Sequence, residues 1–199
     1  MEVYYSLIIF CFVGSITPGP NNIMIMNSAI NYGIYRSLPH YLGICFGFAF
    51  MLLAFGFGLG VIFINYVILH KIVKIIGSIY LLYLAFKIMT LDPKIEAKTV
   101  NIRKPITFIQ SVLFQWTNPK AFILAINVFA IFNFKNMLVS TQVLLITVVN
   151  FIILIFSTGC WLLGGALIKK ILQNYNHVKV FNISMGLLLI LSIGLIYLE

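Results

Sequence analysis

Long apolar runs separated by short polar stretches are the feature of this sequence that most restricts its fold. Of the 199 residues, 62% are hydrophobic and 9% are charged, whereas a soluble domain is about half apolar and a quarter charged. Too few polar residues remain to cover the surface of a soluble globule. Because one membrane crossing needs roughly 20 apolar residues, the chain is long enough for about six crossings. We therefore expect an all-α integral membrane protein.

Six apolar segments are predicted at about 4–30, 39–65, 72–90, 105–133, 142–168 and 179–198. The stretch 91–104 is the only sustained polar one, and it divides the chain into two halves of three segments. We expect a single membrane domain over 1–199, with repeat one at about 1–90, a cytoplasmic loop at 91–104 and repeat two at about 105–199. Since three crossings is an odd number, the two halves would enter the membrane from opposite sides, as inverted repeats.

The basic residues predict the orientation, because cytoplasmic loops of membrane proteins are enriched in lysine and arginine. Nine of the 13 basic residues follow segments one, three and five: Arg36, Lys87, Lys94, Lys98, Arg103, Lys104, Lys169, Lys170 and Lys179. Lys71, Lys74 and Lys135 lie on the opposite side, and Lys120 belongs to neither set. We therefore expect the loop 91–104 in the cytoplasm and both termini outside it. The charge of +9 is explained by these loops, so no nucleic-acid partner is expected.

Polar side chains inside the apolar runs gather in the first segment of each half. Segment one holds Ser15, Thr17, Asn21, Asn22, Asn27 and Ser28, and segment four holds Gln110, Ser111, Gln115, Thr117, Asn118, Lys120 and Asn127. Residues 42–64 contain no charge, amide or hydroxyl but several glycines, which is typical of a packing helix. The Gly-x-x-x-Gly at 43–47 serves either internal packing or a homodimer, and we favour internal packing.

Both polar segments contain a predicted helix break at corresponding positions. The first is Thr17-Pro18-Gly19-Pro20 and the second is Thr117-Asn118-Pro119-Lys120. Proline ends or kinks a helix, and Thr17 and Asn118 each precede a proline, as a helix N-cap would. Each segment then consists of two half-helices with a new N-terminus in mid-span. Such paired interruptions are typical of the binding site of a transporter.

The residue types at the breaks favour a zwitterionic ligand. Two half-helix N-termini present amide donors and positive dipole ends to a carboxylate, and Lys120 adds a cation. Asn21 and Asn22 would bind the α-amino group or a polar side chain of the ligand. All four acidic residues (Glu2, Asp92, Glu96 and Glu199) lie at the ends or in the loop, so a strongly cationic ligand or a metal finds no partner, and no cofactor is expected. The predicted substrate-binding residues are Thr17, Pro18, Gly19, Pro20, Asn21, Asn22, Trp116, Thr117, Asn118, Pro119 and Lys120.

Other readings of these residues stay open. Lys120 lies in a cavity or extends to the cytoplasmic interface, and the asparagines bind substrate or join helices. Trp116 is a cavity wall or a membrane anchor, and His40 is expected at the interface rather than in a proton relay. The coupling ion, if there is one, is a proton or sodium.

The sequence resembles the LysE/RhtB family of amino-acid exporters over its whole length. The resemblance rests on Pro18-Gly19-Pro20 followed by Gly33, Gly43 and Gly47, on Asn118-Pro119-Lys120, and on the run from Gly77 to Lys87. Ser37 stands where the family pattern has a glycine, and the Pro-Gln-Phe that often follows Asn-Pro-Lys is missing. The resemblance implies a bacterial inner-membrane transporter, not an enzyme, that exports amino acids driven by an ion gradient.

Within the family, the branch of cysteine and O-acetylserine exporters looks nearest, on TPGPNNI at 17–23, the glycines at 43 and 47, and Cys160-Trp161-Leu162. We therefore expect export of small neutral amino acids or derivatives by alternating access. The alternatives are export of basic amino acids or of homoserine and threonine, or a membrane scaffold without transport. A passive channel and an intramembrane enzyme are disfavoured, because residues 42–64 carry no polar stripe and no catalytic set is apparent.

Overall fold

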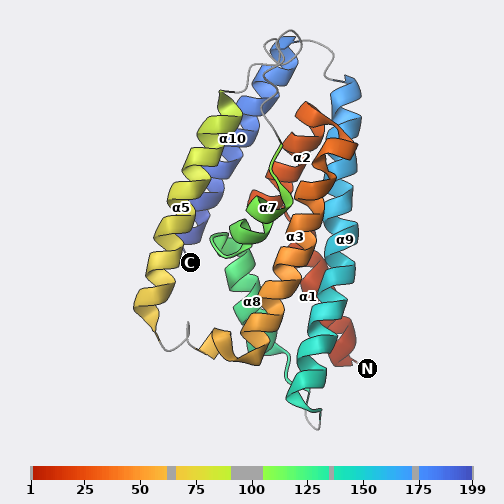
Figure 1. Ribbon diagram of the computed structural model, residues 1–199, viewed down its shortest axis with the longest axis vertical. Coiled ribbons are helices and arrows are strands. Elements are labelled where there is room, and N and C mark those ends of the chain that lie inside the picture. Colours follow the sequence, from red (N-terminus) through yellow and green to blue (C-terminus); the bar gives the residue numbers. More distant parts are fainter. Residues whose placement is uncertain (1, 62–65, 91–104, 135–136, 172–174, 199) are drawn as a thin grey trace.

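The computed structural model describes residues 2–61, 66–90, 105–134, 137–171 and 175–198 (Figure 1). Within these residues every regular element is a helix, which confirms the expected all-α class. The loop 91–104, with its predicted cytoplasmic basic residues, lies outside the described residues, as does Lys135. The elements are α1 (Glu2–Ile16), α2 (Pro20–Tyr32), α3 (Ile34–Ala54), the π-helical η1 (Phe55–Leu59), α5 (Val67–Met89), α7 (Phe108–Gln115), α8 (Pro119–Ile131), α9 (Val139–Ile171) and α10 (Tyr175–Leu198).

Some helices are long enough and apolar enough to cross a membrane. Within the described residues these are Ile34–Leu59, which joins α3 and η1, and Val139–Ile168 of α9. The pair α1 and α2 passes the same test as one span, bent by 52° at its break. Ile75–Met89, Pro119–Ile131 and Asn176–Leu191 are shorter apolar helices. Length and composition therefore support two of the six expected crossings, and a third where α1 and α2 count as one bent span.

The first break separates α1 from α2 at Thr17–Gly19. Proline at position 20 is the first residue of α2, where its missing N–H is no loss. The N-cap position therefore falls on Gly19, which is extended and offers no side-chain acceptor. The prediction that Thr17 caps this helix is wrong, because the helix begins two residues later than Pro18 would start it. The Thr17 hydroxyl instead donates to the carbonyl of Gly14, at 3.3 Å.

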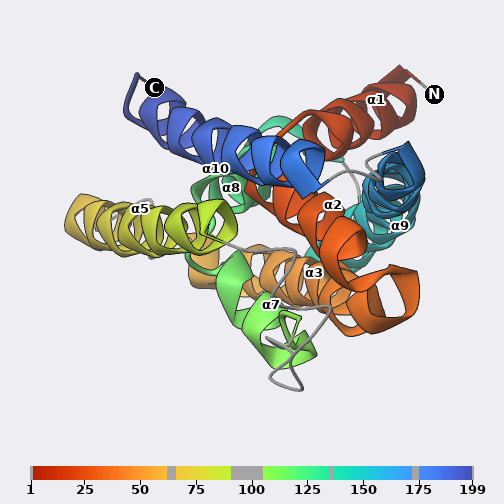
Figure 2. The same ribbon diagram turned by 90° about the horizontal axis from the view of Figure 1, so that it is seen from above.

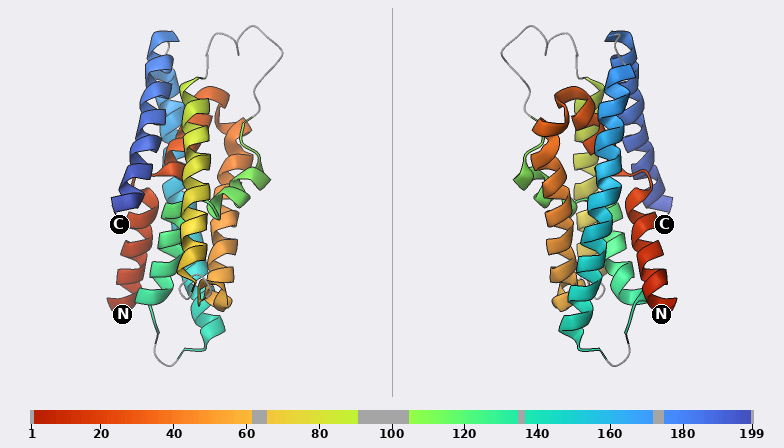
Figure 3. Two further views of the ribbon diagram at one scale, coloured as in Figure 1. Left: turned by 90° about the vertical axis from the view of Figure 1, so that its left-hand side faces the viewer. Right: turned by 90° about the vertical axis from the view of Figure 1, so that its right-hand side faces the viewer.

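The second break separates α7 from α8 at Trp116–Asn118. Thr107 and Gln110 form a capping box at the start of α7. The side chain of Asn118 accepts the amide of Lys120 at 3.2 Å, and Pro119 follows as the first residue of α8. The predicted N-cap at Asn118 is thus confirmed. Together, α7 and α8 run in the direction opposite to α1 and α2 (Figures 1 and 3).

Glycines set the close helix contacts that hold the two breaks together. On α3, a Cβ atom at Gly43 would lie 2.5 Å from the carbonyl oxygen of Phe108, and one at Gly47 would lie 2.7 Å from the Cα of Val112. Both glycines therefore pack internally against α7, as expected. On α9, Gly165 faces the carbonyl of Met26 in α2. Viewed from above, α9 lies along α1, α2 and α3, while α5 and α10 lie side by side (Figure 2).

The turn between α2 and α3 requires glycine. Gly33 has φ of +80°, a left-handed conformation that residues with a side chain rarely adopt. Its amide donates to the carbonyl of Ala29 at 2.9 Å and so ends α2. This reversal sends α3 back alongside α2 and brings its glycine face to α7.

Candidate functional site

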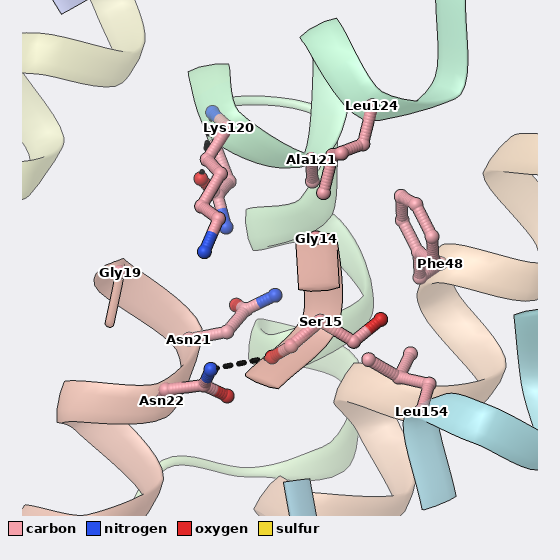
Figure 4. A pocket seen from close by; sticks show the side chains of 11 residues that line it. Gly14, Ser15, Gly19, Asn21, Asn22, Phe48, Lys120, Ala121, Leu124 and Leu154 are labelled. Atoms are coloured by element: carbon pink, nitrogen blue, oxygen red, sulfur yellow. Dashed lines mark hydrogen bonds between the residues drawn. The ribbon is translucent and has the colours of Figure 1, made fainter. Parts of the chain in front are cut away.

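A small cavity lies where the two helix breaks meet (Figure 4). Its volume is about 30 Å³, which holds on the order of one water molecule. Predicted site residues and apolar residues from α1, α3, α8 and α9 share its wall. The lining residues are Gly14, Ser15, Gly19, Asn21, Asn22, Phe48, Asn118, Lys120, Ala121, Leu124 and Leu154.

The carbonyl groups that end α1, here called the α1 carbonyl end (residues 15–18), are satisfied by side chains from three other elements. The Asn22 amide donates to the carbonyls of Ser15 and Thr17 at 2.7 and 2.9 Å. The indole of Trp161 on α9 donates to the Ile16 carbonyl at 3.0 Å. A helix that stops inside a protein leaves such acceptors without intrahelical donors. These contacts therefore fix the end of α1 at the cavity.

Lys120 supplies the third set of donors to the α1 carbonyl end. Its Nζ lies 2.8 Å from the Thr17 carbonyl, 2.8 Å from the Thr17 hydroxyl and 3.3 Å from the Pro18 carbonyl. The side chain is half-buried and lines the cavity. Its charge meets the negative end of the α1 dipole. Lys120 of the second half of the chain is thus paired with the carbonyl end of a half-helix in the first half.

The amides of Asn21 and Gln115 join the two breaks directly. Asn21 Nδ2 donates to Gln115 Oε1 at 2.8 Å, and Gln115 Nε2 donates to Asn21 Oδ1 at 3.2 Å. Gln115 is fully buried and also donates to the Ser111 carbonyl at 2.9 Å. The predicted site omits Gln115, although an amide beside a break in an apolar segment is the same signal that singled out Asn21.

The structure brings some predicted site residues to the cavity and not others. Gly19, Asn21, Asn22, Asn118 and Lys120 line it. Thr17 and Pro18 do not line it but contact Lys120, which does, whereas Pro20 and Pro119 are buried first residues of their helices. The Thr117 carbonyl lies against Gly77 of α5.

Trp116 does not line this cavity. Its ring lies 6.1 Å from the ring of Phe50 and 6.3 Å from that of Phe55, measured between centroids. It packs against α3 and η1 at the second break. Its role as a cavity wall or substrate contact therefore stays a prediction without support from this cavity.

A second buried polar cluster lies farther along α2. Asn27 donates to Asn182 Oδ1 on α10 at 2.9 Å, and Ser28 Oγ lies 2.8 Å from His40 Nδ1 on α3. His40 is fully buried, with Ser28 of α2 at its ring, and its expected place at the membrane interface stays a prediction. These contacts join α2 to its neighbours.

Metal ligands are not clustered in the part of the chain that the structure describes. No group of three or more His, Cys, Asp or Glu side chains there is arranged to hold an ion. Cys11 instead accepts a hydrogen bond from Asn150 at 2.9 Å. The polar groups that line the cavity are side-chain amides, a hydroxyl and one ammonium group.

Comparison with known proteins identifies the family. The model of the LysE type translocator family matches residues 12–197. The cysteine/O-acetylserine efflux protein of Escherichia coli O157:H7 is 29% identical over 182 residues, which cover 91% of this chain and 90% of that protein. Proteins of the same name from Salmonella paratyphi A and Salmonella typhi match to the same extent. No solved structure matches the chain.

These matches confirm the resemblance drawn from the two proline motifs. They also place the apolar helices in a membrane and confirm the expectation of a transporter in place of an enzyme. The chain belongs to the LysE type translocator family, whose members are membrane-embedded amino-acid efflux transporters.

Proposed function

We propose that this protein exports small neutral amino acids or their derivatives, of the cysteine and O-acetylserine type, from the cytoplasm by alternating access. The observation that carries this proposal is the meeting of two antiparallel helix breaks at one cavity that holds a lysine and no acidic residue. The relatives named as cysteine/O-acetylserine efflux proteins support the substrate class.

The substrate carboxylate would bind at Asn118, Lys120 and the first turns of α2 and α8. These two half-helices begin at the cavity, and helix N-termini favour anions. No side chain that lines the cavity is acidic, so a second positive charge on the substrate would have no partner there. This supports neutral amino acids over lysine and arginine.

Alternating access would rock one three-helix unit against the other around the breaks. The opposite directions of α1–α2 and α7–α8 support two inverted repeats, about 1–90 and 105–199. The cavity of about 30 Å³ is smaller than an amino acid, so the site must widen for binding. This small volume suits an occluded state between the outward- and inward-open forms.

The orientation rests on the basic residues of the sequence. Their excess after segments one, three and five supports a cytoplasmic loop at 91–104 and termini outside the cytoplasm. We propose a bacterial inner-membrane location and coupling to a proton or sodium gradient. A homodimer stays a prediction, because the glycines at 43 and 47 are used within the chain.

The test is accumulation of labelled amino acids in inside-out vesicles that contain the protein. The panel is cysteine, O-acetylserine, threonine, leucine, lysine and arginine, each with and without an imposed pH gradient. We expect uptake of a neutral member, increased by the gradient. Replacement Lys120→Ala should abolish uptake in a protein that still inserts, whereas Lys87→Ala, which removes an exposed lysine of α5, should leave it intact.

Three results would contradict the proposal. Uptake of lysine or arginine in preference to the neutral members would refute the argument from the missing acidic residue. Normal uptake by well-expressed Lys120→Ala protein would refute the assignment of Lys120. Absence of uptake of every member by folded protein would favour a scaffold.

A further inference from the structure

The contact between Lys120 and the α1 carbonyl end has the chemistry of a cation site. Three oxygens, two from Thr17 and one from Pro18, lie within 3.3 Å of the Lys120 ammonium. None of these oxygens carries a formal charge, and none of the residues lining the cavity is acidic. The cation is instead held by carbonyl dipoles at the negative end of a helix. In broken-helix transporters, such carbonyl ends coordinate small cations.

Other donors define which oxygens belong to this site. The Ser15 carbonyl is bound by Asn22, and the Ile16 carbonyl is bound by Trp161. The Thr17 carbonyl is shared by Asn22 and Lys120, and the Thr17 hydroxyl and the Pro18 carbonyl accept from Lys120. Asn22 and Trp161 therefore hold the end of α1 in place. Lys120, which contacts the remaining oxygens, has the longer and more flexible side chain.

We propose that these oxygens of Thr17 and Pro18 bind the α-ammonium group of the transported amino acid, and that Lys120 holds their place when no substrate is bound. The proposal rests on the proposed function, in which the substrate is a zwitterion. A lysine ammonium and an α-ammonium are the same chemical group, each with three N–H donors. The oxygens that accept one therefore accept the other.

Exchange of the two ammonium groups leaves each of these oxygens with a donor. Substrate enters with its ammonium on the Thr17 and Pro18 oxygens, and Lys120 turns to the substrate carboxylate near Asn118. In either state a cation donates to the Thr17 and Pro18 oxygens, so none of the hydrogen bonds that Lys120 makes there is lost without replacement. Without substrate, Lys120 returns to the α1 carbonyl end.

The geometry around Gly19 supports this exchange. A Cβ atom on Gly19 would lie 2.7 Å from Cδ of Lys120 and 3.1 Å from its Nζ, so the lysine stem runs directly over the Gly19 backbone. The cavity lies beside it (Figure 4). When the side chain turns away, the volume that it occupied joins the cavity, which enlarges the site where the substrate must fit.

The asparagines that the sequence assigned to the substrate have other partners in this structure. The Asn22 amide is bound to two carbonyls of the α1 carbonyl end, and Asn21 is paired with Gln115. The oxygens that Lys120 contacts, beside the cavity that it lines, are thus acceptors that a substrate ammonium can take by exchange with the lysine. The site then requires an amino group together with a carboxylate.

The first test uses Lys120→Met, which keeps the length of the apolar stem and removes the ammonium. Thermal unfolding of the purified protein in detergent is measured with methylammonium, tetramethylammonium or sodium chloride at equal ionic strength. We expect methylammonium to raise the Tm of Lys120→Met and to leave the wild type unchanged. Tetramethylammonium has no N–H donor and should have no effect. Lys87→Met is the matched control and should behave as the wild type.

Each other result overturns the proposal. An equal rise with sodium would make this a site for an inorganic cation. A methylammonium effect on the wild type or on Lys87→Met would show that the effect does not depend on the vacated oxygens. Absence of any methylammonium effect on folded Lys120→Met would show that the oxygens do not accept a free ammonium group.

A second test uses the wild-type protein and stays available if Lys120→Met does not fold. Labelled cysteine bound to purified protein is displaced with cysteine or with 3-mercaptopropionate, which is cysteine without its amino group. We expect 3-mercaptopropionate to be at least about tenfold weaker, as for the loss of a hydrogen-bonded charged group. Equal displacement would overturn the proposal. Because both tests measure binding, failure of export would show separately, as absent uptake in vesicles.

Discussion

The amides of Asn21 and Gln115 face each other across the two helix breaks and exchange hydrogen bonds of 2.8 and 3.2 Å. The pair joins α2 of the first half of the chain to α7 of the second. It is therefore a direct tie between the two units that alternating access would move. Its strength is measurable by substitution.

We expect Asn21→Ala and Gln115→Ala each to lower the free energy of unfolding by about 1–3 kcal/mol, because each leaves the other amide without its partner. The double variant should lose less than the sum of the two, with a coupling of about 1 kcal/mol. Denaturant unfolding of the purified proteins measures this. The control pair is Asn133→Ala, at an exposed asparagine, with Gln115→Ala. The losses in free energy of unfolding of these two variants should add in the double variant. Additive losses in the Asn21–Gln115 pair would show that the two amides act independently.

Two adjacent glycines of α9 offer a matched test of helix packing. A Cβ atom on Gly165 would lie 2.5 Å from the Met26 carbonyl, whereas one on Gly164 would meet no atom within 4 Å. We expect Gly165→Ala to destabilise the protein by about 1–3 kcal/mol through overpacking. Gly164→Ala should be neutral or stabilising, since alanine is the better helix former. Equal thermal stability of the two variants would contradict the close approach of α2 and α9.

Gly77 of α5 positions the second break. A Cβ atom here would collide with the Thr117 carbonyl. We expect Gly77→Ala to displace the start of α8, with Asn118 and Lys120, and to lower the initial rate of uptake in vesicles by about tenfold or more. Gly194→Ala, where nothing lies within 4 Å, is the control and should transport normally. Unchanged uptake by Gly77→Ala would show that the break tolerates movement.

Two substitutions at Asn118 distinguish its role as a helix cap from its proposed role in binding the substrate carboxylate. Asn118→Ala should cost about 1 kcal/mol of stability, because the Lys120 amide loses its acceptor. Asn118→Asp keeps the cap and should keep the stability, but its negative charge opposes a substrate carboxylate. We therefore expect the Asp variant to fold as the wild type and to lose uptake. Normal uptake by the Asp variant would place the carboxylate elsewhere.

Local sequence decided the class of the fold and the places where helices stop. Apolar runs predict membrane helices, and the prolines at 18, 20 and 119 predict the two breaks, because proline lacks an N–H wherever it stands. The cap at Asn118 is equally local, since it bonds an amide two residues away. The cap assigned to Thr17 was wrong because the second proline, Pro20, shifts the helix start.

Only the tertiary structure decided what the polar residues at the breaks bind. Lys120 meets oxygens 102 and 103 residues away, and Asn21 meets an amide 94 residues away. The burial of His40 beneath α2 likewise depends on how helices pack. Sequence shows which groups must find partners in the apolar interior, because unpaired polar groups there are costly. Which partner each group finds depends on the distances between helices, and glycines such as Gly43, Gly47 and Gly165 set those distances through contacts made only in the folded chain.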